Sequence, residues 1–102
     1  MGHTHLPNSE LVKALLQPLL RDFDYWFSQA GTLLNQEDLS FLSDEQLTDL
    51  RLRLREAQGE VQAAHALLET TGAGIDTALL MGWHRLVTDC WHLRMRARSN
   101  RT

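Results

Sequence analysis

The chain has 102 residues, enough for one domain that buries roughly 65% of its unfolded surface, and too few for a deep active-site cavity as well. Hydrophobic residues make up 43% and charged residues 23%, which excludes disorder along the whole length. The formal net charge of −3 is divided unevenly, because residues 1–50 hold eight acids against two basic residues, whereas residues 51–102 hold eight arginines against five acids.

The first predicted element is a long helix that begins at about Ser9, after an N-terminus of residues 1–8 that we expect to be disordered or tag-like. From Leu11 to Leu34 the apolar residues recur with a period of 3.6. Pro18 falls inside this pattern and removes one backbone hydrogen bond. Because the apolar face continues in phase on both sides, we expect a kink near Pro18 and no full break.

The second predicted helix begins after Ser43. Residues 43–46, Ser-Asp-Glu-Gln, have the form of a capping box and place two acids in the first turn. Gly72 and Gly74 predict its end near Thr70. Between these points apolar residues recur at alternating spacings of three and four, a seam that is stable only when another helix covers it. The seam consists of Leu47, Leu50, Leu54, Ala57, Val61, Ala64 and Leu68.

The third predicted helix carries two adjoining apolar rows. It begins either at Asp76, a suitable N-cap, or near Gly82, which is unfavourable inside a helix. Two rows exceed what one neighbouring helix covers, so the second serves either the bundle or an external partner. The first row is Leu79, Trp83, Leu86, Cys90, Leu93 and Ala97, and the second row is Leu80, His84, Val87, Trp91 and Met95.

These elements predict an all-α fold, an antiparallel three-helix bundle with long helices. No segment alternates with a period of two over a convincing length, so no strands are expected. Short connections favour antiparallel neighbours. We expect residues 9–98 to form a single domain, followed by a basic tail at residues 99–102.

Catalytic and metal-binding readings of the sequence are weak. His84 and Cys90 are six residues apart, which places them about 120° apart on a helix, so they do not converge on one ion. Cys90 falls on the apolar row, where a free cysteine acts as a small hydrophobe. Asp22 and Asp24 point to different sides of their helix. The sequence therefore predicts no enzyme activity, no metal and no cofactor.

The single cysteine and the lack of a long apolar run indicate the cellular compartment of the protein. A single cysteine excludes an internal disulfide and fits a reducing compartment. No apolar run approaches the roughly 20 residues that span a bilayer, and the N-terminus lacks a signal pattern. We therefore expect a cytoplasmic protein without a membrane partner.

Tryptophan supplies the main signal for binding. Trp26, Trp83 and Trp91 are many for so short a chain, and tryptophan is enriched where proteins bind proteins. Core filling is the alternative for each of them. Trp91 favours an interface because it lies on the second row of the last helix. The predicted protein-binding residues are that row, Leu80, His84, Val87, Trp91 and Met95.

A run of arginines near the C-terminus allows two interpretations. These side chains contact an anion such as RNA, or they are favourable charges at a helix C-terminus. Few aromatic residues are interleaved with them and the whole chain is negative, which disfavours nucleic acid. The residues concerned are Arg94, Arg96, Arg98 and Arg101.

Three segments resemble a family of small uncharacterised cyanobacterial proteins: LVKALLQPLLRDFDYWF at residues 11–27, LSFLSDE at 39–45 and MGWHRLVTDCW at 81–91. The similarity extends from about Ser9 to Arg96, although the family pattern has proline at the position of Gly82. The resemblance implies a cyanobacterial cytoplasmic protein without an assigned enzyme activity. It also suggests ribonuclease E as a candidate partner.

The sequence as a whole predicts a non-enzymatic protein–protein interaction module that regulates a larger cytoplasmic enzyme or complex. Its partner is another protein or a second copy of the chain, with no small-molecule substrate. Two alternatives stay open. One is an RNA-associated accessory protein that uses the C-terminal arginines, and the other is a small homodimeric structural protein.

Overall fold

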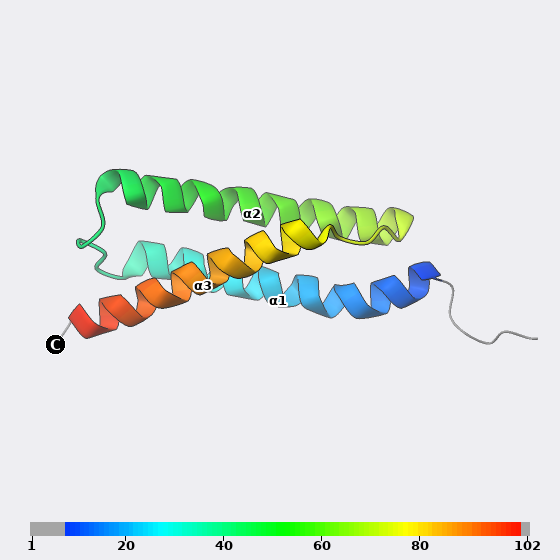
Figure 1. The fold of residues 1–102 in the computed structure, drawn as a ribbon, viewed down its shortest axis with the longest axis horizontal. Helices are drawn as coiled ribbons and strands as arrows, with labels where there is room; N and C mark the ends of the chain where they lie inside the picture. Colours follow the sequence, from blue (N-terminus) through cyan, green and yellow to red (C-terminus); the bar gives the residue numbers. More distant parts are fainter. Residues whose placement is uncertain (1–7, 101–102) are drawn as a thin grey trace, which may run out of the picture.

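The computed structural model describes residues 8–100, which form three helices: α1 (Asn8–Gln36), α2 (Asp44–Thr71) and α3 (Thr77–Asn100). No strand occurs in this part of the chain. Helices α1 and α2 are antiparallel, and α3 returns beside them in the direction of α1 (Figure 1). The predicted all-α bundle is confirmed. The expectations for residues 1–7 and for Arg101 lie outside the described residues.

Helix α1 continues through Pro18, as the phase of its apolar face predicts. An interior proline costs a helix about 3 kcal/mol in isolation. Burial on both sides of Pro18 offsets this cost, because Leu20 and Phe27 are fully buried and Leu16 packs against the core. The helix begins at Asn8, one residue earlier than expected.

The ends of α2 are fixed by local chemistry. The Ser43 hydroxyl accepts a hydrogen bond from the Gln46 backbone N–H at 3.1 Å, and the Gln46 side-chain oxygen accepts one from the Ser43 N–H at 2.8 Å. Both halves of the predicted capping box are therefore present. At the other end Gly72 adopts φ 69°, in the left-handed region, and its N–H donates to the Leu68 carbonyl at 3.0 Å.

Helix α3 begins directly after Asp76. The Asp76 carboxylate accepts a hydrogen bond from the Ala78 N–H at 2.9 Å, and its carbonyl accepts from the N–H groups of Leu79 and Leu80. Asp76 is thus the N-cap, and the alternative start near Gly82 is wrong. The helix extends to Asn100, so residues 99 and 100 belong to α3 and not to a tail.

The core lies where the two predicted seams meet α1. Trp83 of α3 packs edge-on against Phe23 of α1, with ring centroids 5.2 Å apart, and its indole N–H donates to Glu60 of α2 at 3.0 Å. A single tryptophan therefore contacts both neighbouring helices. The predicted seam residues that are buried are Leu50, Leu54, Ala57, Val61 and Leu68 on α2, and Trp83, Leu86, Cys90 and Ala97 on α3.

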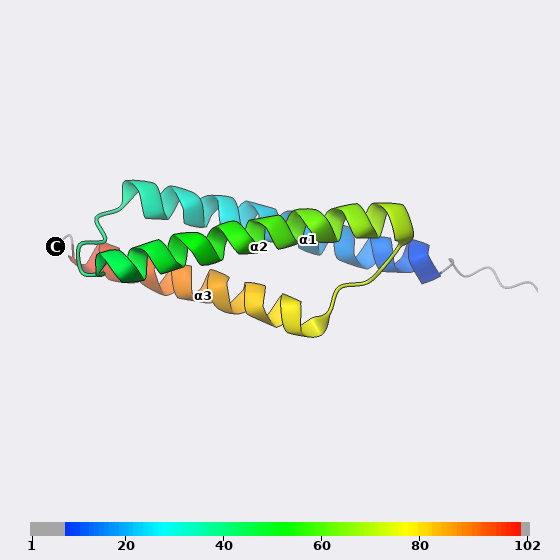
Figure 2. The same ribbon diagram turned by 90° about the horizontal axis from the view of Figure 1, so that it is seen from above.

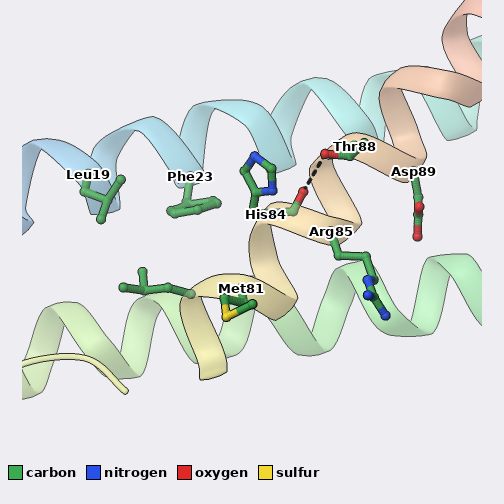
Figure 3. Close-up of a pocket in the computed structure, with 8 residues that line it drawn as sticks. Leu19, Phe23, Met81, His84, Arg85, Thr88 and Asp89 are labelled. Carbon is green, nitrogen blue, oxygen red and sulfur yellow. Dashed lines mark hydrogen bonds between the residues drawn. The ribbon is translucent and has the colours of Figure 1, made fainter. Parts of the chain in front are cut away.

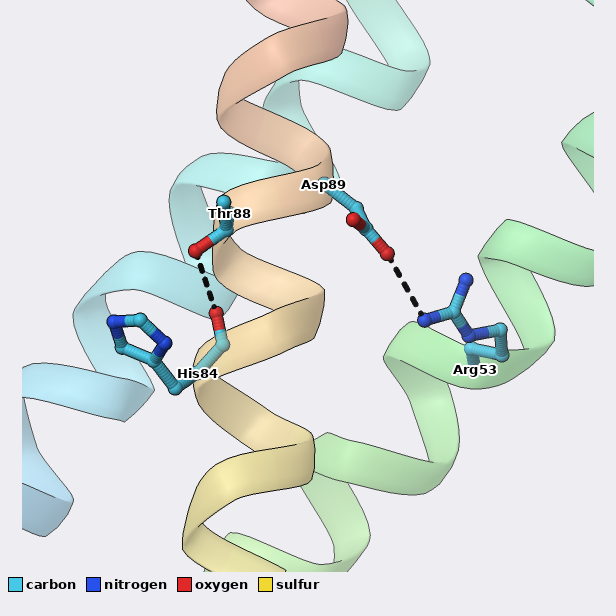
Figure 4. A network of polar contacts seen from close by, with 4 residues as sticks. All are labelled: Arg53, His84, Thr88 and Asp89. Carbon is cyan, nitrogen blue, oxygen red and sulfur yellow. Dashed lines mark hydrogen bonds and ion pairs between the residues drawn. The ribbon is translucent and has the colours of Figure 1, made fainter.

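Polar contacts set the register between the helices. The Asp24 carboxylate of α1 contacts His65 of α2 at 3.1 Å and accepts a hydrogen bond from Gln62 at 3.2 Å. On the other side of α2, Arg53 forms an ion pair with Asp89 of α3 at 3.3 Å (Figure 4). An exposed pair of this kind contributes only about 0–1 kcal/mol, so it orients α3 more than it stabilises the bundle.

Helix α3 covers only part of the α1–α2 pair. The connection at residues 72–76 carries the chain back along the bundle, and α3 starts well inside the end that α1 and α2 form together (Figure 2). Leu11 and Leu15 of α1 and Leu67 of α2 lie toward that end, and 48%, 66% and 54% of their surfaces are exposed. The bundle is therefore a complete three-helix structure over only part of its length.

Candidate protein-binding face

Two hollows lie one after the other between helices α1 and α3, which run in the same direction. We call them together the α1–α3 groove and define its walls by Leu19, Phe23 and Trp26 on α1 and by Leu80, His84 and Trp91 on α3. Its wider part has a volume of about 610 Å³. Leu19 and Phe23 point from α1 toward α3 in this part, and the His84 ring stands between the two helices (Figure 3).

Two polar groups of the wider part have partners, one within α3 and one on α2. The Thr88 hydroxyl donates to the His84 carbonyl at 2.9 Å, and Asp89 is held by Arg53 (Figure 4). The His84 ring and the Arg85 side chain form no hydrogen bond or ion pair with another residue of the described chain. The wider part therefore offers a mainly apolar surface with the His84 ring at its edge, because the Arg85 side chain points toward α2 (Figure 3).

The narrower part of the groove is a hollow of about 30 Å³ between two tryptophans. Trp26 of α1 is 42% exposed and Trp91 of α3 is 50% exposed, and both border the hollow. The Tyr25 ring, itself exposed, packs edge-on against Trp26 at 5.3 Å. Three aromatic side chains from two helices thus remain partly in water.

The predicted protein-binding row follows the outer edge of the contact between α3 and α1. Leu80 and Val87 are half-buried and pack against the core, whereas His84 and Trp91 are exposed and Met95 is 52% exposed. Two residues of the row therefore pack within the bundle, and the other three face solvent. Its role in binding stays a prediction.

Tyr25 belongs to this face, although the sequence pattern does not single it out. For Trp26 the sequence leaves two interpretations open, an interface and core filling, and the structure places it at the surface with 42% of it exposed. A signal was present, because adjacent residues are about 100° apart on a helix and Tyr25 and Trp26 do not both point at one core. The packing of the helices determines that these rings are exposed, because α3 leaves this side of α1 partly uncovered.

The C-terminal arginines do not form one cluster. The Arg96 guanidinium lies 4.3 Å from the centre of the Phe41 ring, which ties the end of α3 to the connection between α1 and α2. Arg94 and Arg98 are four residues apart and share a different side of α3, where Arg94 borders the tryptophan hollow. Neither forms an ion pair within residues 8–100. Arg101 lies outside the described residues.

Cys90 borders the same hollow but is unsuited to nucleophilic chemistry. Burial raises the pKa of its thiol to about 11, and the neighbouring Asp89 carboxylate adds to this rise more than Arg53 opposes it. The thiol is therefore protonated at neutral pH, whereas thiolates are the reactive form. Residues 8–100 hold no group of three His, Cys, Asp or Glu side chains arranged for a metal ion.

None of the described helices is both long and apolar enough to cross a membrane. No curated protein and no solved structure matches the chain. One family model does match, over residues 6–99, and its description is a protein of unknown function, DUF2605. Since this match covers nearly the whole chain, the protein belongs to the DUF2605 family.

Proposed function

We propose that this protein is a non-catalytic interaction module that binds another protein through the α1–α3 groove. The observation that carries the proposal is the cluster of Tyr25, Trp26 and Trp91, whose rings come from two helices and remain exposed beside an apolar groove. Clusters of aromatic residues that the fold leaves partly open are typical of protein-binding sites.

The energy available at this cluster supports the proposal. The exposed half of a tryptophan side chain corresponds to about 100 Å² of mainly apolar surface. Removing that area from water favours a complex by about 2.5 kcal/mol. Trp26 and Trp91 together therefore supply a gross gain of about 5 kcal/mol, enough for a central hot spot.

A regulatory role toward a larger enzyme or complex is part of the proposal. A small bundle with one binding face acts by occupying a surface of its partner. Ribonuclease E is the first candidate to test, as the sequence resemblance suggests, in a cyanobacterial cytoplasm. A homodimer and an RNA-associated protein are the competing functions.

Site-specific photo-crosslinking tests the proposal. A photoreactive phenylalanine analogue replaces Trp91 in one sample and Leu52 in a matched control, because Leu52 is also 50% exposed but lies on α2. We expect a heterologous protein cross-linked from position 91 in native cells and not from position 52. Cross-links only between two copies would favour the homodimer. Equal labelling from both positions would overturn the proposal.

A further inference from the structure

We infer that α3 separates as a unit from the α1–α2 hairpin, residues 8–71, while the hairpin stays folded, and that residues 72–76 are the hinge of this motion. The three helices are attached to one another unequally, and α3 has the weaker attachments. The separation does not depend on the proposed function, although its consequence for binding does.

Helices α1 and α2 are joined along most of their length. Side-chain hydrogen bonds between them extend from Gln17 of α1 to the Leu34 carbonyl, with Asp24 between these two points. Four of the largest fully buried side chains in the described chain belong to this pair: Leu20 and Phe27 on α1, and Val61 and Leu68 on α2. The hairpin therefore retains hydrogen bonds and large apolar side chains of its own when α3 is away.

Helix α3 is anchored by one large side chain. Trp83 contacts Phe23 of α1 and Glu60 of α2. After Leu86 the buried residues of α3 are Cys90 and Ala97, whose small side chains remove little apolar area from water. The C-terminal half of the helix is therefore held less firmly than its beginning.

Open space lies on two sides of α3. Hollows of about 300 Å³ each lie between α2 and α3, one on either side of Arg53 along α2. The wider part of the α1–α3 groove, about 610 Å³, lies toward α1. The ion pair of Arg53 with Asp89 crosses between the two hollows, but both side chains are partly exposed and water weakens the pair. Close packing, which makes a core rigid, is thus interrupted around α3.

The connection at residues 72–76 suits a hinge. Hinges are short connecting segments that absorb large backbone changes. Gly72 already has a φ of 69°, and an added Cβ on Gly74 would meet no atom within 4 Å, so packing restrains neither glycine. The Asp76 carboxylate caps α3 from the connection itself. The helix therefore keeps its N-cap when it moves, and it moves as a unit.

Separation of α3 takes apart the α1–α3 groove, because the walls of the groove come from both helices. Trp91 leaves Trp26, and the hollow between them no longer exists. A partner that binds through the groove therefore binds only chains in which α3 is docked. The docking equilibrium then sets the apparent affinity for that partner.

Thiol labelling of the native full-length chain with N-ethylmaleimide measures the separation. Cys90 is the only thiol and is 4% exposed, and the adjacent hollow of about 30 Å³ is too small for the reagent. The labelling rate divided by the rate in the unfolded chain gives an opening constant. We expect this constant to exceed the global unfolding constant from urea titration at least about tenfold, with a weaker dependence on urea.

The matched control places the thiol between α1 and α2. It combines Cys90→Ala with Leu54→Cys, because Leu54 is 5% exposed and faces Gly31 of α1. The opening constant at position 54 should equal the global unfolding constant of that chain. Comparison with each chain's own stability removes the effect of the substitution on stability.

A second pair of variants tests the contact at the end of α3. Arg96→Ala removes the guanidinium from the Phe41 ring and should raise the opening constant of Cys90 about two- to fivefold. Arg98→Ala is the control, since Arg98 is also exposed but lies on another side of α3, and it should change the constant less than about twofold.

Equal opening and global unfolding constants for Cys90 would overturn the inference, because α3 would then leave only when the whole chain unfolds. Amide hydrogen exchange of the native chain gives an independent measurement without any substitution. Lower protection of α3 than of the hairpin is expected, and one level of protection for all three helices would contradict it. A permanently docked α3 would leave the α1–α3 groove intact, so failure here is distinct from failure of the proposed function.

Discussion

Trp26 and Trp91 are 65 positions apart in the sequence, yet they border one hollow on the outer side of the bundle. One comes from the middle of α1 and the other from the middle of α3. Their juxtaposition follows from the parallel course of these two helices. Because both rings are large and partly exposed, a partner that covers the hollow would remove a substantial apolar area from water.

The first prediction contrasts a buried with an exposed tryptophan of α3. Trp83 is 2% exposed and contacts Phe23 and Glu60, whereas Trp91 is 50% exposed. Trp83→Ala should lower the free energy of unfolding by about 3–5 kcal/mol. Trp91→Ala should lower it by about 1 kcal/mol or less. Urea unfolding followed by circular dichroism measures both, and equal losses would show that α3 is rotated relative to the structure described here.

The second prediction concerns the glycines of α2 and α3. Gly59 and Gly82 are exposed inside helices, and an added Cβ would meet no atom within 4 Å. Gly59→Ala and Gly82→Ala should therefore each raise the free energy of unfolding by about 0.5–1 kcal/mol. Gly72→Ala should lower it by about 1 kcal/mol, because φ 69° strains any side chain with a Cβ. Thermal unfolding of the three variants gives the signs, and a stabilising Gly72→Ala would contradict the left-handed cap.

The third prediction is a pH dependence from Cys90. Its pKa is about 11 in the fold against 9.0 for an ordinary thiol, so the unfolded chain loses this proton first as the pH rises. Below about pH 8 both states keep the proton and stability is unaffected. Between pH 9 and 11 the free energy of unfolding should fall by about 1–2 kcal/mol more in the native chain than in Cys90→Ala. Urea titrations at several pH values compare the two, and parallel curves would refute a buried thiol.

Local features of the fold were predictable from the sequence because they depend on neighbours along the chain. The capping box needs only Ser43 and Gln46, and the end of α2 needs only Gly72 in the left-handed conformation. The seam of α2 follows from its spacing alone. The start of α3 was ambiguous, because the cost of Gly82 is about 1 kcal/mol and the N-cap at Asp76 contributes a similar amount.

The spacing of apolar residues does not show which side chains stay exposed, because that depends on how the helices pack. Apolar periodicity assigned Trp26 and Leu15 to a core-facing side of α1, but α3 starts too late to cover Leu15 and leaves Trp26 partly open. The contact of Arg96 with Phe41 joins residues 55 positions apart. The sequence therefore does not show that Arg96 points to a different side of α3 from Arg94 and Arg98. The surplus of apolar rows on α3 predicts that Trp91 faces outward, and in the structure it is 50% exposed.

The most direct test of the central claim is the affinity of the partner captured at position 91 for three purified proteins: the native chain, Trp91→Ala and Leu52→Ala. Isothermal titration calorimetry measures all three. A hot spot in the α1–α3 groove predicts a Kd at least about 30-fold weaker for Trp91→Ala, equivalent to 2 kcal/mol, and an unchanged Kd for Leu52→Ala. Equal affinities for the native chain and Trp91→Ala would contradict recognition through this face.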